Sequence, residues 1–140
     1  MAGVHFSYDN FKQLLRLSIG IAQRLDENRA ESLTILYCDF NTFSQEEIDT
    51  SLRDVLRNSD SIVNHDGDHF FVLPYTDKYG AGIVKTQFDD FFGQSLTSFL
   101  VSYPVDGEKA EDLLEFLQNS VNRFCKKDLV YLDELYLLNE

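Results

Sequence analysis

The sequence is poor in several residue types, and the shortage of cysteine bears on its class. It contains no tryptophan, one methionine, two prolines and two cysteines in 140 residues. A small secreted domain held together by disulfides needs more cysteines than this, so that class is excluded. Cys38 and Cys125 lie far apart in the chain and form no Cys-x-x-Cys motif. This pattern favours free thiols in a reducing cytoplasm, with a disulfide as the less favoured alternative.

Basic residues are also scarce. The chain has 12 Lys and Arg against 24 Asp and Glu, which gives a formal net charge of −12. A negative field of this size repels phosphates, so we expect no nucleic-acid partner and no attachment to anionic membranes. A nucleotide ligand would need a local basic group that overcomes this field.

Long hydrophobic runs are missing as well. No stretch approaches the roughly 20 apolar residues that cross a bilayer, which excludes direct membrane insertion. The N-terminal segment MAGVHFSYDN lacks the basic region and apolar run of a signal peptide. The length is that of one domain with a sizeable core, so we expect a single domain over residues 1–140. The sequence leaves open whether this domain is a piece of a longer protein.

Apolar residues recur at helical spacing in four segments and form strand-like runs in four others. Helices are predicted over residues 11–25, 44–56, 77–92 and 110–126, the second opened by a Ser44–Glu47 capping box. Strands are predicted over residues 33–40, 61–65, 69–75 and 96–104. Residues 128–138 predict an edge strand or a last turn. This order indicates an α/β (α+β) fold with a βαββαβ core of the ferredoxin or polymerase-palm kind, and one mixed sheet flanked by helices.

The most polar segment, HDGDH at residues 65–69, separates two of the predicted strands. Asp-Gly favours a tight hairpin turn with a positive φ angle. Imidazole and carboxylate groups also suit zinc, which makes candidate ligands of His65, Asp66, Asp68 and His69. Alternation within strands places neighbouring side chains on opposite faces, which argues against all four converging on one ion. Asp39 and Asp68 together are a second candidate, for magnesium.

Four stretches, in this order and spacing, resemble a GGDEF domain, the fold of diguanylate cyclases. They are YCDFNTF, then RNSD five residues before DGDHF, then FFVLPYTD, and then SYPVDGEKAEDLL. The resemblance runs from about the first predicted helix to Cys125. It implies that the place of the GGDEF motif, which cradles GTP, is taken by Asp66, Gly67, Asp68, His69 and Phe70. It also implies that Asp39 and Asp68 stand at the metal-binding positions of the family.

The sequence departs from the family pattern at positions that the family's chemistry needs. Joining two GTP molecules requires metal ions held by carboxylates, and a bare glycine where the backbone approaches the triphosphate. Asp66 replaces the first glycine of the motif, and His69 replaces its glutamate. The segment between NTF and RNSD is shorter than in the family and lacks the Asn and Asp that recognise guanine. The family's phosphate-binding lysine aligns with Cys125 or, after a two-residue slip, with Lys127.

These departures imply a degenerate GGDEF domain that is not an enzyme. On this interpretation no residue is catalytic and no cofactor is needed. Asp39 and Asp68 are then vestigial metal positions, and we expect no bound magnesium.

One motif of the family is retained. Arg57 and Asp60 form an RxxD sequence at the spacing of the inhibitory site, or I-site, which implies cyclic di-GMP as the ligand. Arg can donate two hydrogen bonds to O6 and N7 of guanine, and a carboxylate can accept from its other edge. The I-site usually draws on a second arginine, for which the following helix offers only Lys85, and an ammonium is no bidentate substitute. The plain alternative is a helix C-terminus with Arg57 and Asp60 solvated or loosely paired.

Three classes of function remain. The first is a non-catalytic receptor or regulatory module of cyclic di-GMP signalling. The second is a protein–protein interaction module, which binds no nucleotide and uses its acidic face for a basic partner or for flanking domains. The third, a residual nucleotide-processing enzyme, is disfavoured by the replaced residues. Cys38 has no clear His partner, so we interpret it as a buried structural cysteine, and the Phe-rich segment at residues 88–94 as core rather than as an exposed partner surface.

Overall fold

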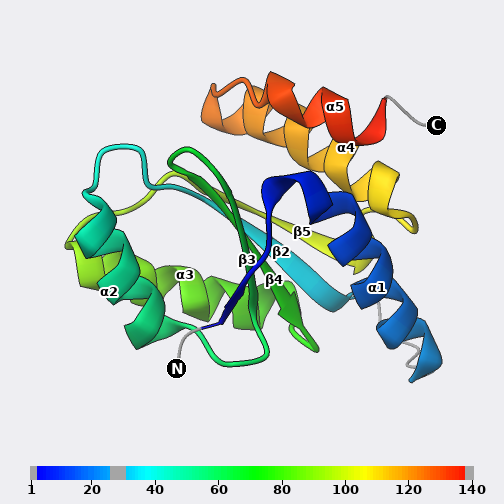
Figure 1. Ribbon diagram of the computed structural model, residues 1–140, viewed down its shortest axis with the longest axis horizontal. Coiled ribbons are helices and arrows are strands. Elements are labelled where there is room, and N and C mark those ends of the chain that lie inside the picture. The colour runs from blue at the N-terminus through cyan, green and yellow to red at the C-terminus, as the bar shows by residue number, and fades with distance from the viewer. Residues whose placement is uncertain (1–2, 26–30, 138–140) are drawn as a thin grey trace.

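The structure is a computed structural model and describes residues 3–25 and 31–137. Strands and helices are interspersed along this part of the chain, with β3 and β4 adjacent as a hairpin (Figure 1). The strands are β1 (Val4–His5), β2 (Glu31–Asp39), β3 (Ser61–His65), β4 (Asp68–Pro74) and β5 (Ser98–Pro104). The α-helices are α1 (Phe11–Arg24), α2 (Gln45–Val55), α3 (Lys78–Phe92), α4 (Ala110–Ser120) and α5 (Asp133–Tyr136). Two 3-10 turns, η1 (Tyr8–Asn10) and η3 (Val130–Leu132), and a π-helical turn, η2 (Val121–Cys125), complete them.

The described strands form one sheet in the order β1-β3-β4-β2-β5. β1 runs parallel to β3, and the other neighbouring pairs are antiparallel, so the sheet is mixed. β2 lies inside the sheet between β4 and β5, as its nearly continuous apolar run predicts. The α+β fold class with a mixed sheet flanked by helices is therefore confirmed.

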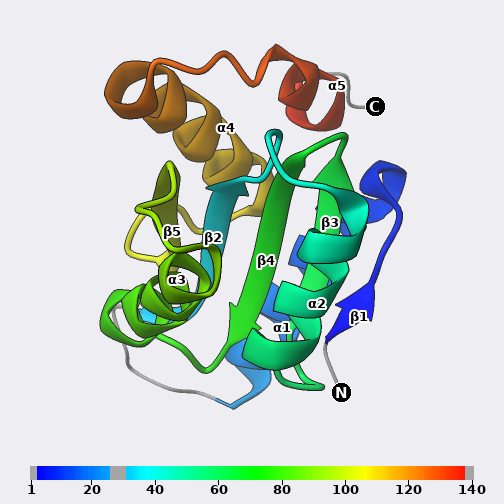
Figure 2. The same ribbon diagram turned by 90° about the vertical axis from the view of Figure 1, so that its left-hand side faces the viewer.

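Helices cover both faces of this sheet. α1 and α4 lie on one face, and α2 and α3 lie on the other (Figures 1 and 2). Alternate residues of β2 enter two separate cores: Ile35 and Tyr37 pack with α1 and α4, while Leu36 and Cys38 pack with α2 and α3. A slip of one residue would exchange every side chain between the two cores, so this packing fixes the register of β2 against β4.

β3 and β4 form the hairpin that the Asp-Gly sequence predicts. His65 pairs with Asp68, and Asp66 and Gly67 make the two-residue turn between them. Asp66 has the positive φ angle, 53°. Asp tolerates this left-handed conformation better than most residues because its short side chain can bond locally. The hairpin prediction is confirmed.

The C-terminal residues differ from the prediction. α4 ends at Ser120, earlier than expected, and continues as the π-helical turn η2 before Lys126 adopts a left-handed φ of 60°. The following residues form η3 and α5, so the expectation of an edge strand is wrong and that of a last turn is closer. The reason is the spacing of Leu129, Leu132 and Leu135, three residues apart, which suits helical turns that bury all three. β1, which the sequence did not predict, is the sheet edge beside β3.

The first helix is apolar on more than one side. Phe11, Leu15 and Ile19 are buried, but Leu17 is 61% and Ile21 46% exposed. A helix with apolar residues around most of its circumference cannot bury all of them against a single sheet.

None of the helices in the described part of the chain has both the length and the apolar character needed to span a bilayer.

Candidate functional site

Two carboxylates meet where β2 ends and β4 begins. Asp39 is the last residue of β2 and pairs directly with Asp68, the first residue of β4. Residues directly opposite each other in antiparallel strands have side chains on the same face. The two carboxylates therefore lie together, on the face that α1 and α4 cover. This is the place that the family resemblance gave to the metal-binding positions.

A lysine from the C-terminal part of the chain lies between these carboxylates. The Nζ atom of Lys127 donates to Asp39 Oδ2 at 3.2 Å and to Asp68 Oδ1 at 3.0 Å. Burial lowers the pKa of Lys127, but its hydrogen bonds to Asp68 and Asp39 and their negative charges outweigh this, so the pKa is raised. Of the two alignments that the sequence allowed, the structure brings Lys127 to the site. The Cys125 thiol is directed to the carbonyl of Ser98, 3.5 Å away.

Neutral groups also donate hydrogen bonds to the oxygens of these two carboxylates. Asn41 donates to Asp39 Oδ1 through its backbone N at 3.0 Å and its side-chain Nδ2 at 2.6 Å, and the same Nδ2 lies 3.0 Å from Asp68 Oδ1. The hydroxyls of Tyr37 and Tyr131 donate to Asp68 Oδ1 and Oδ2 at 2.9 and 2.6 Å. Burial raises the pKa of Asp39, but the hydrogen bonds from Asn41 and Lys127 outweigh it and lower the pKa. All four carboxylate oxygens thus accept hydrogen bonds.

The turn after β2 packs directly on the hairpin tip. A Cβ atom placed on Gly67 would lie 2.6 Å from the Cα atom of Asn41. The backbone N of Phe40 donates to the carbonyl of Gly67 at 2.9 Å. Glycine is therefore needed here for the contact with Asn41, and the side chain of Asp66 points into solvent with 92% exposed. The space beside the bare glycine is filled by the Cα atom and the side chain of Asn41.

The Asp39–Asp68 pair does not fit a magnesium ion. Magnesium needs oxygen ligands at about 2.0–2.1 Å in an octahedral arrangement. Here the oxygens face an ammonium, an amide and two hydroxyls, all of them donors. Within residues 3–25 and 31–137, no group of three or more His, Cys, Asp or Glu could hold a metal ion.

The two histidines beside the hairpin tip lie on opposite faces, as strand alternation predicts. His65 stacks on Tyr131 with ring centroids 3.8 Å apart. His69 is buried on the other face, against Phe40 and Phe71. Burial lowers the pKa of His69. The zinc alternative fails because His65 and His69 cannot reach a common ion.

Arg57 and Asp60 lie after the end of α2 and before β3. Asp60 is 2% exposed, and its Oδ2 atom accepts from the backbone N of Arg57 at 2.9 Å. Its Oδ1 atom lies 3.5 Å from Arg57 Nη2 and is buried without a hydrogen-bond partner among the described residues. The Arg57 side chain is 66% exposed. Asp60 therefore shapes the turn, while the guanidinium remains accessible.

A cavity of about 450 Å³ lies beside this pair. Its lining includes Arg57, Asp60, Tyr75, Asp77 and Gln87. Lys85, the candidate helper residue on α3, does not line it. The Nζ atom of Lys85 is bound instead to Asp89 at 2.5 Å and to Ser95 at 3.3 Å.

The two cysteines and the Phe-rich segment lie mainly in the two cores. Cys38 is fully buried in the α2–α3 core, and burial raises the pKa of its thiol, as expected for a structural cysteine. Cys38 and Cys125 pack with cores on opposite faces of the sheet, which explains why both are free. In the Phe-rich segment Phe88 is buried, as predicted, but Phe91 is 37% exposed.

No family model matches the chain, and no curated protein matches it. Among solved structures, it is similar to the crystal structure of the GGDEF domain of YfiN, also called TpbB, from Pseudomonas aeruginosa. That comparison has a TM-score of 0.62 and 16% identity, and covers 84% of this chain and 89% of the other. A second structure, a truncated form comprising only the GGDEF domain of the same protein, gives a TM-score of 0.61 and 16% identity over 78% of this chain and 77% of that one. The chain is therefore a GGDEF-like domain in its fold; identity this low carries the fold alone.

Proposed function

We propose that this GGDEF-like domain is a non-catalytic receptor or regulatory module of cyclic di-GMP signalling, which binds cyclic di-GMP through Arg57 and Asp60. The observation that carries the proposal is the exposed guanidinium of Arg57 at the edge of a cavity of about 450 Å³. This basic group is the local exception that a phosphate-containing ligand needs in a chain of net charge −12.

Three neighbouring groups support a guanine contact at this site. The guanidinium can donate to O6 and N7 of a guanine base in a fork. Tyr75, which is 53% exposed and also lines the cavity, offers an aromatic face on which a base can stack. The unpartnered Oδ1 atom of Asp60 is an acceptor for the opposite edge of the base, and because it is buried this contact requires the loop at Arg57–Asp60 to open.

The non-catalytic part of the proposal rests on the Asp39–Asp68 pair. Its oxygens are engaged by Lys127, Asn41 and two tyrosines, an arrangement that leaves no place for the metal ions of nucleotide condensation. The negatively charged Asp66 stands where the family has glycine. We place the domain in the cytoplasm, where free thiols persist.

Calorimetric titration with cyclic di-GMP tests the proposal, with GTP as the control ligand. We expect cyclic di-GMP binding that is weakened in Arg57→Ala and unchanged in Arg53→Ala. Arg53 is the matched control because it is exposed on α2 and does not line the cavity. Absence of heat at high micromolar cyclic di-GMP would reject the receptor function.

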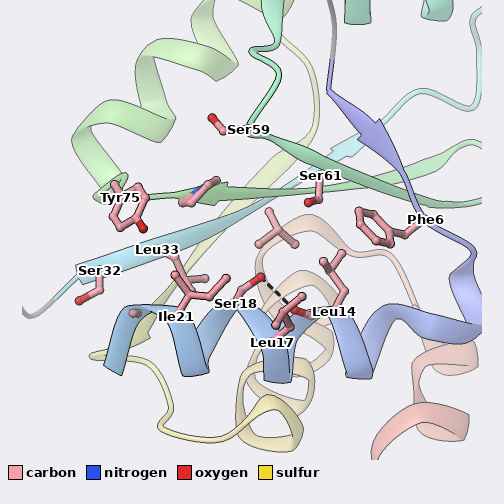
Figure 3. A pocket seen from close by; sticks show the side chains of 13 residues that line it. Phe6, Leu14, Leu17, Ser18, Ile21, Ser32, Leu33, Ser59, Ser61 and Tyr75 are labelled. Atoms are coloured by element: carbon pink, nitrogen blue, oxygen red, sulfur yellow. Dashed lines mark hydrogen bonds between the residues drawn. The ribbon is translucent and has the colours of Figure 1, made fainter. Parts of the chain in front are cut away.

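A second candidate function, a protein-interaction module, is favoured by the exposed apolar side of α1. Leu17, Ile21 and Leu25 are 61%, 46% and 45% exposed and lie four residues apart, on one side of the helix. Beside them a hollow of about 170 Å³ opens between α1 and the sheet, where Phe6 and Leu14 face the strands (Figure 3). α1 carries Lys12, Arg16 and Arg24 and no acidic residue, but Lys12 and Arg16 are paired with Glu111 of α4, so charge on this side favours neither an acidic nor a basic partner. If Leu17→Gln keeps the fold but no longer binds a protein partner that the unaltered domain binds, this side of α1 is the binding surface.

A further inference from the structure

We infer that Lys127 is the permanent cation of the Asp39–Asp68 pair, and that the C-terminal cap, defined as residues 126–137, thereby takes the place that a divalent metal ion has in the family. Figure 2 shows the cap running along the end of the sheet above β2 and β4. The inference goes beyond the ligand proposed at Arg57 and does not depend on it.

The first step is electrostatic. Register places the carboxylates of Asp39 and Asp68 opposite each other, and two like charges this close need a positive partner to remain ionised. The Lys127 ammonium bridges them at 3.2 and 3.0 Å. The side chains of Asp39, Asp68 and Lys127 are only 24%, 11% and 29% exposed. Solvent therefore screens their interaction less than that of a surface ion pair. Without Lys127, two partly buried acids would be left without a counter-charge.

The second step is coordination. The Nδ2 group of Asn41 joins Oδ1 of both carboxylates, so two separate donors, an amide and an ammonium, link the acids. Tyr37 and Tyr131 occupy further positions on Asp68. A divalent ion shared by the two acids would have to displace Lys127 and break these hydrogen bonds, while itself shedding bound water.

The third step concerns how firmly Lys127 is held. The Tyr131 hydroxyl bonds to Asp68, its ring stacks on His65, and its carbonyl accepts from the hydroxyl of Tyr8 at 2.8 Å. Leu129 and Leu132 are fully buried on either side of Tyr131. The chain is therefore held on both sides of Lys127, by η2 before it and by the buried residues of the cap after it. The ammonium cannot leave the carboxylates by a free swing of the chain, as a mobile surface lysine could.

The test uses manganese as a paramagnetic probe of the full chain, with NMR of backbone amides as the readout. In the unaltered protein we expect the amide signals of Asp39 and Asp68 to broaden no more than those of exposed acids such as Glu46 on α2. Selective broadening at Asp39 and Asp68 would overturn the inference, and this measurement needs no variant.

Lys127→Met provides the second arm because it keeps the length of the side chain and removes its charge. Lys126→Met is the matched control, since Lys126 is the adjacent exposed lysine in the same cap. We expect Lys127→Met to lower the unfolding midpoint by several degrees and to acquire manganese broadening at Asp39 and Asp68, while Lys126→Met does neither. A folded Lys127→Met protein without such broadening would also overturn the inference. Failure of Lys127→Met to fold, beside a folded control, is the result of losing a required counter-charge and supports it.

These outcomes separate this inference from the proposed function. Cyclic di-GMP binding at Arg57 is measured by calorimetry without manganese, and neither result determines the other.

Discussion

Asn41 and Gly67 approach so closely that a single added carbon on Gly67 would lie 2.6 Å from the Cα atom of Asn41. This contact holds the turn after β2 against the hairpin tip and sets the position of the Asn41 amide on both carboxylates. Side-chain atoms of Asn41 also lie within contact of this point, but the Cα atom belongs to the backbone and cannot move aside by a change of rotamer.

Gly67→Ala is therefore expected to destabilise the protein by about 1–3 kcal/mol, the usual range for overpacking. Gly20→Ala is the control: nothing lies within 4 Å of a Cβ there, and the residue is exposed inside α1. Ala in place of Gly at such a helical position should stabilise by roughly 0.5–1 kcal/mol. Urea unfolding of the two variants measures both effects, and equal stabilities would contradict the close approach.

Arg57→Ala should weaken cyclic di-GMP binding by about 1–3 kcal/mol, the contribution of one bidentate base contact. The fold should hardly change, since the side chain is exposed. Arg57→Lys should bind almost as poorly because an ammonium lacks the fixed fork of a guanidinium. Binding should weaken modestly with added salt. If Arg57→Lys binds cyclic di-GMP as tightly as the unaltered protein, charge alone and not guanine recognition holds the ligand.

Purified protein with GTP and magnesium should yield no cyclic di-GMP. Combining Asp66→Gly with His69→Glu should not restore synthesis, since Lys127 still occupies the carboxylate pair and the guanine-recognition segment is still missing. Chromatography of the reaction mixture measures the product. Cyclic di-GMP formed by the unaltered chain would make the domain an enzyme and reject the non-catalytic proposal.

Stability should fall when the pH drops below 6.5, the ordinary pKa of histidine, because burial lowers the pKa of His69 in the folded protein. Below pH 6.5 the unfolded chain binds a proton at His69 that the folded protein does not bind. The free energy of unfolding therefore keeps its full value above pH 6.5 and decreases as the pH falls toward the lowered pKa. His69→Gln, which does not titrate, should lose less stability over this interval. Urea midpoints at several pH values give the comparison, and identical slopes for the two proteins would exclude His69 as the cause.

Much of the fold is predictable because its signals are local. The apolar run of β2, the Asp-Gly turn and the Ser44–Glu47 capping box each lie within a few residues, and each forms as expected. The C-terminal segment was less predictable because its apolar run at residues 129–132 is typical of a strand, whereas the three-residue spacing of its leucines suits helical turns.

The candidate site was predicted only in part. Asp39 and Asp68 could be assigned from the resemblance, and Arg57 from its spacing to the hairpin. Tyr131 gave no signal in the sequence, as it lies 63 residues from Asp68 and meets it only through the path of the cap. The sequence left Lys127 as one of two alignments, because an α-helix continued to Lys126 would have directed the following side chains differently from the π-helical turn that forms.

The two-residue strand β1 gives the N-terminal part of the chain a short mechanical route to the Arg57 cavity. The backbone N of Val4 donates to the carbonyl of Asp60 at 2.9 Å, and the carboxylate of the same Asp60 holds the backbone of Arg57. Two hydrogen bonds through Asp60 therefore connect the backbone of Val4 with the backbone of Arg57. If this connection transmits a displacement of β1 to the loop, hydrogen exchange at the amides of Val4 and Arg57 should rise together.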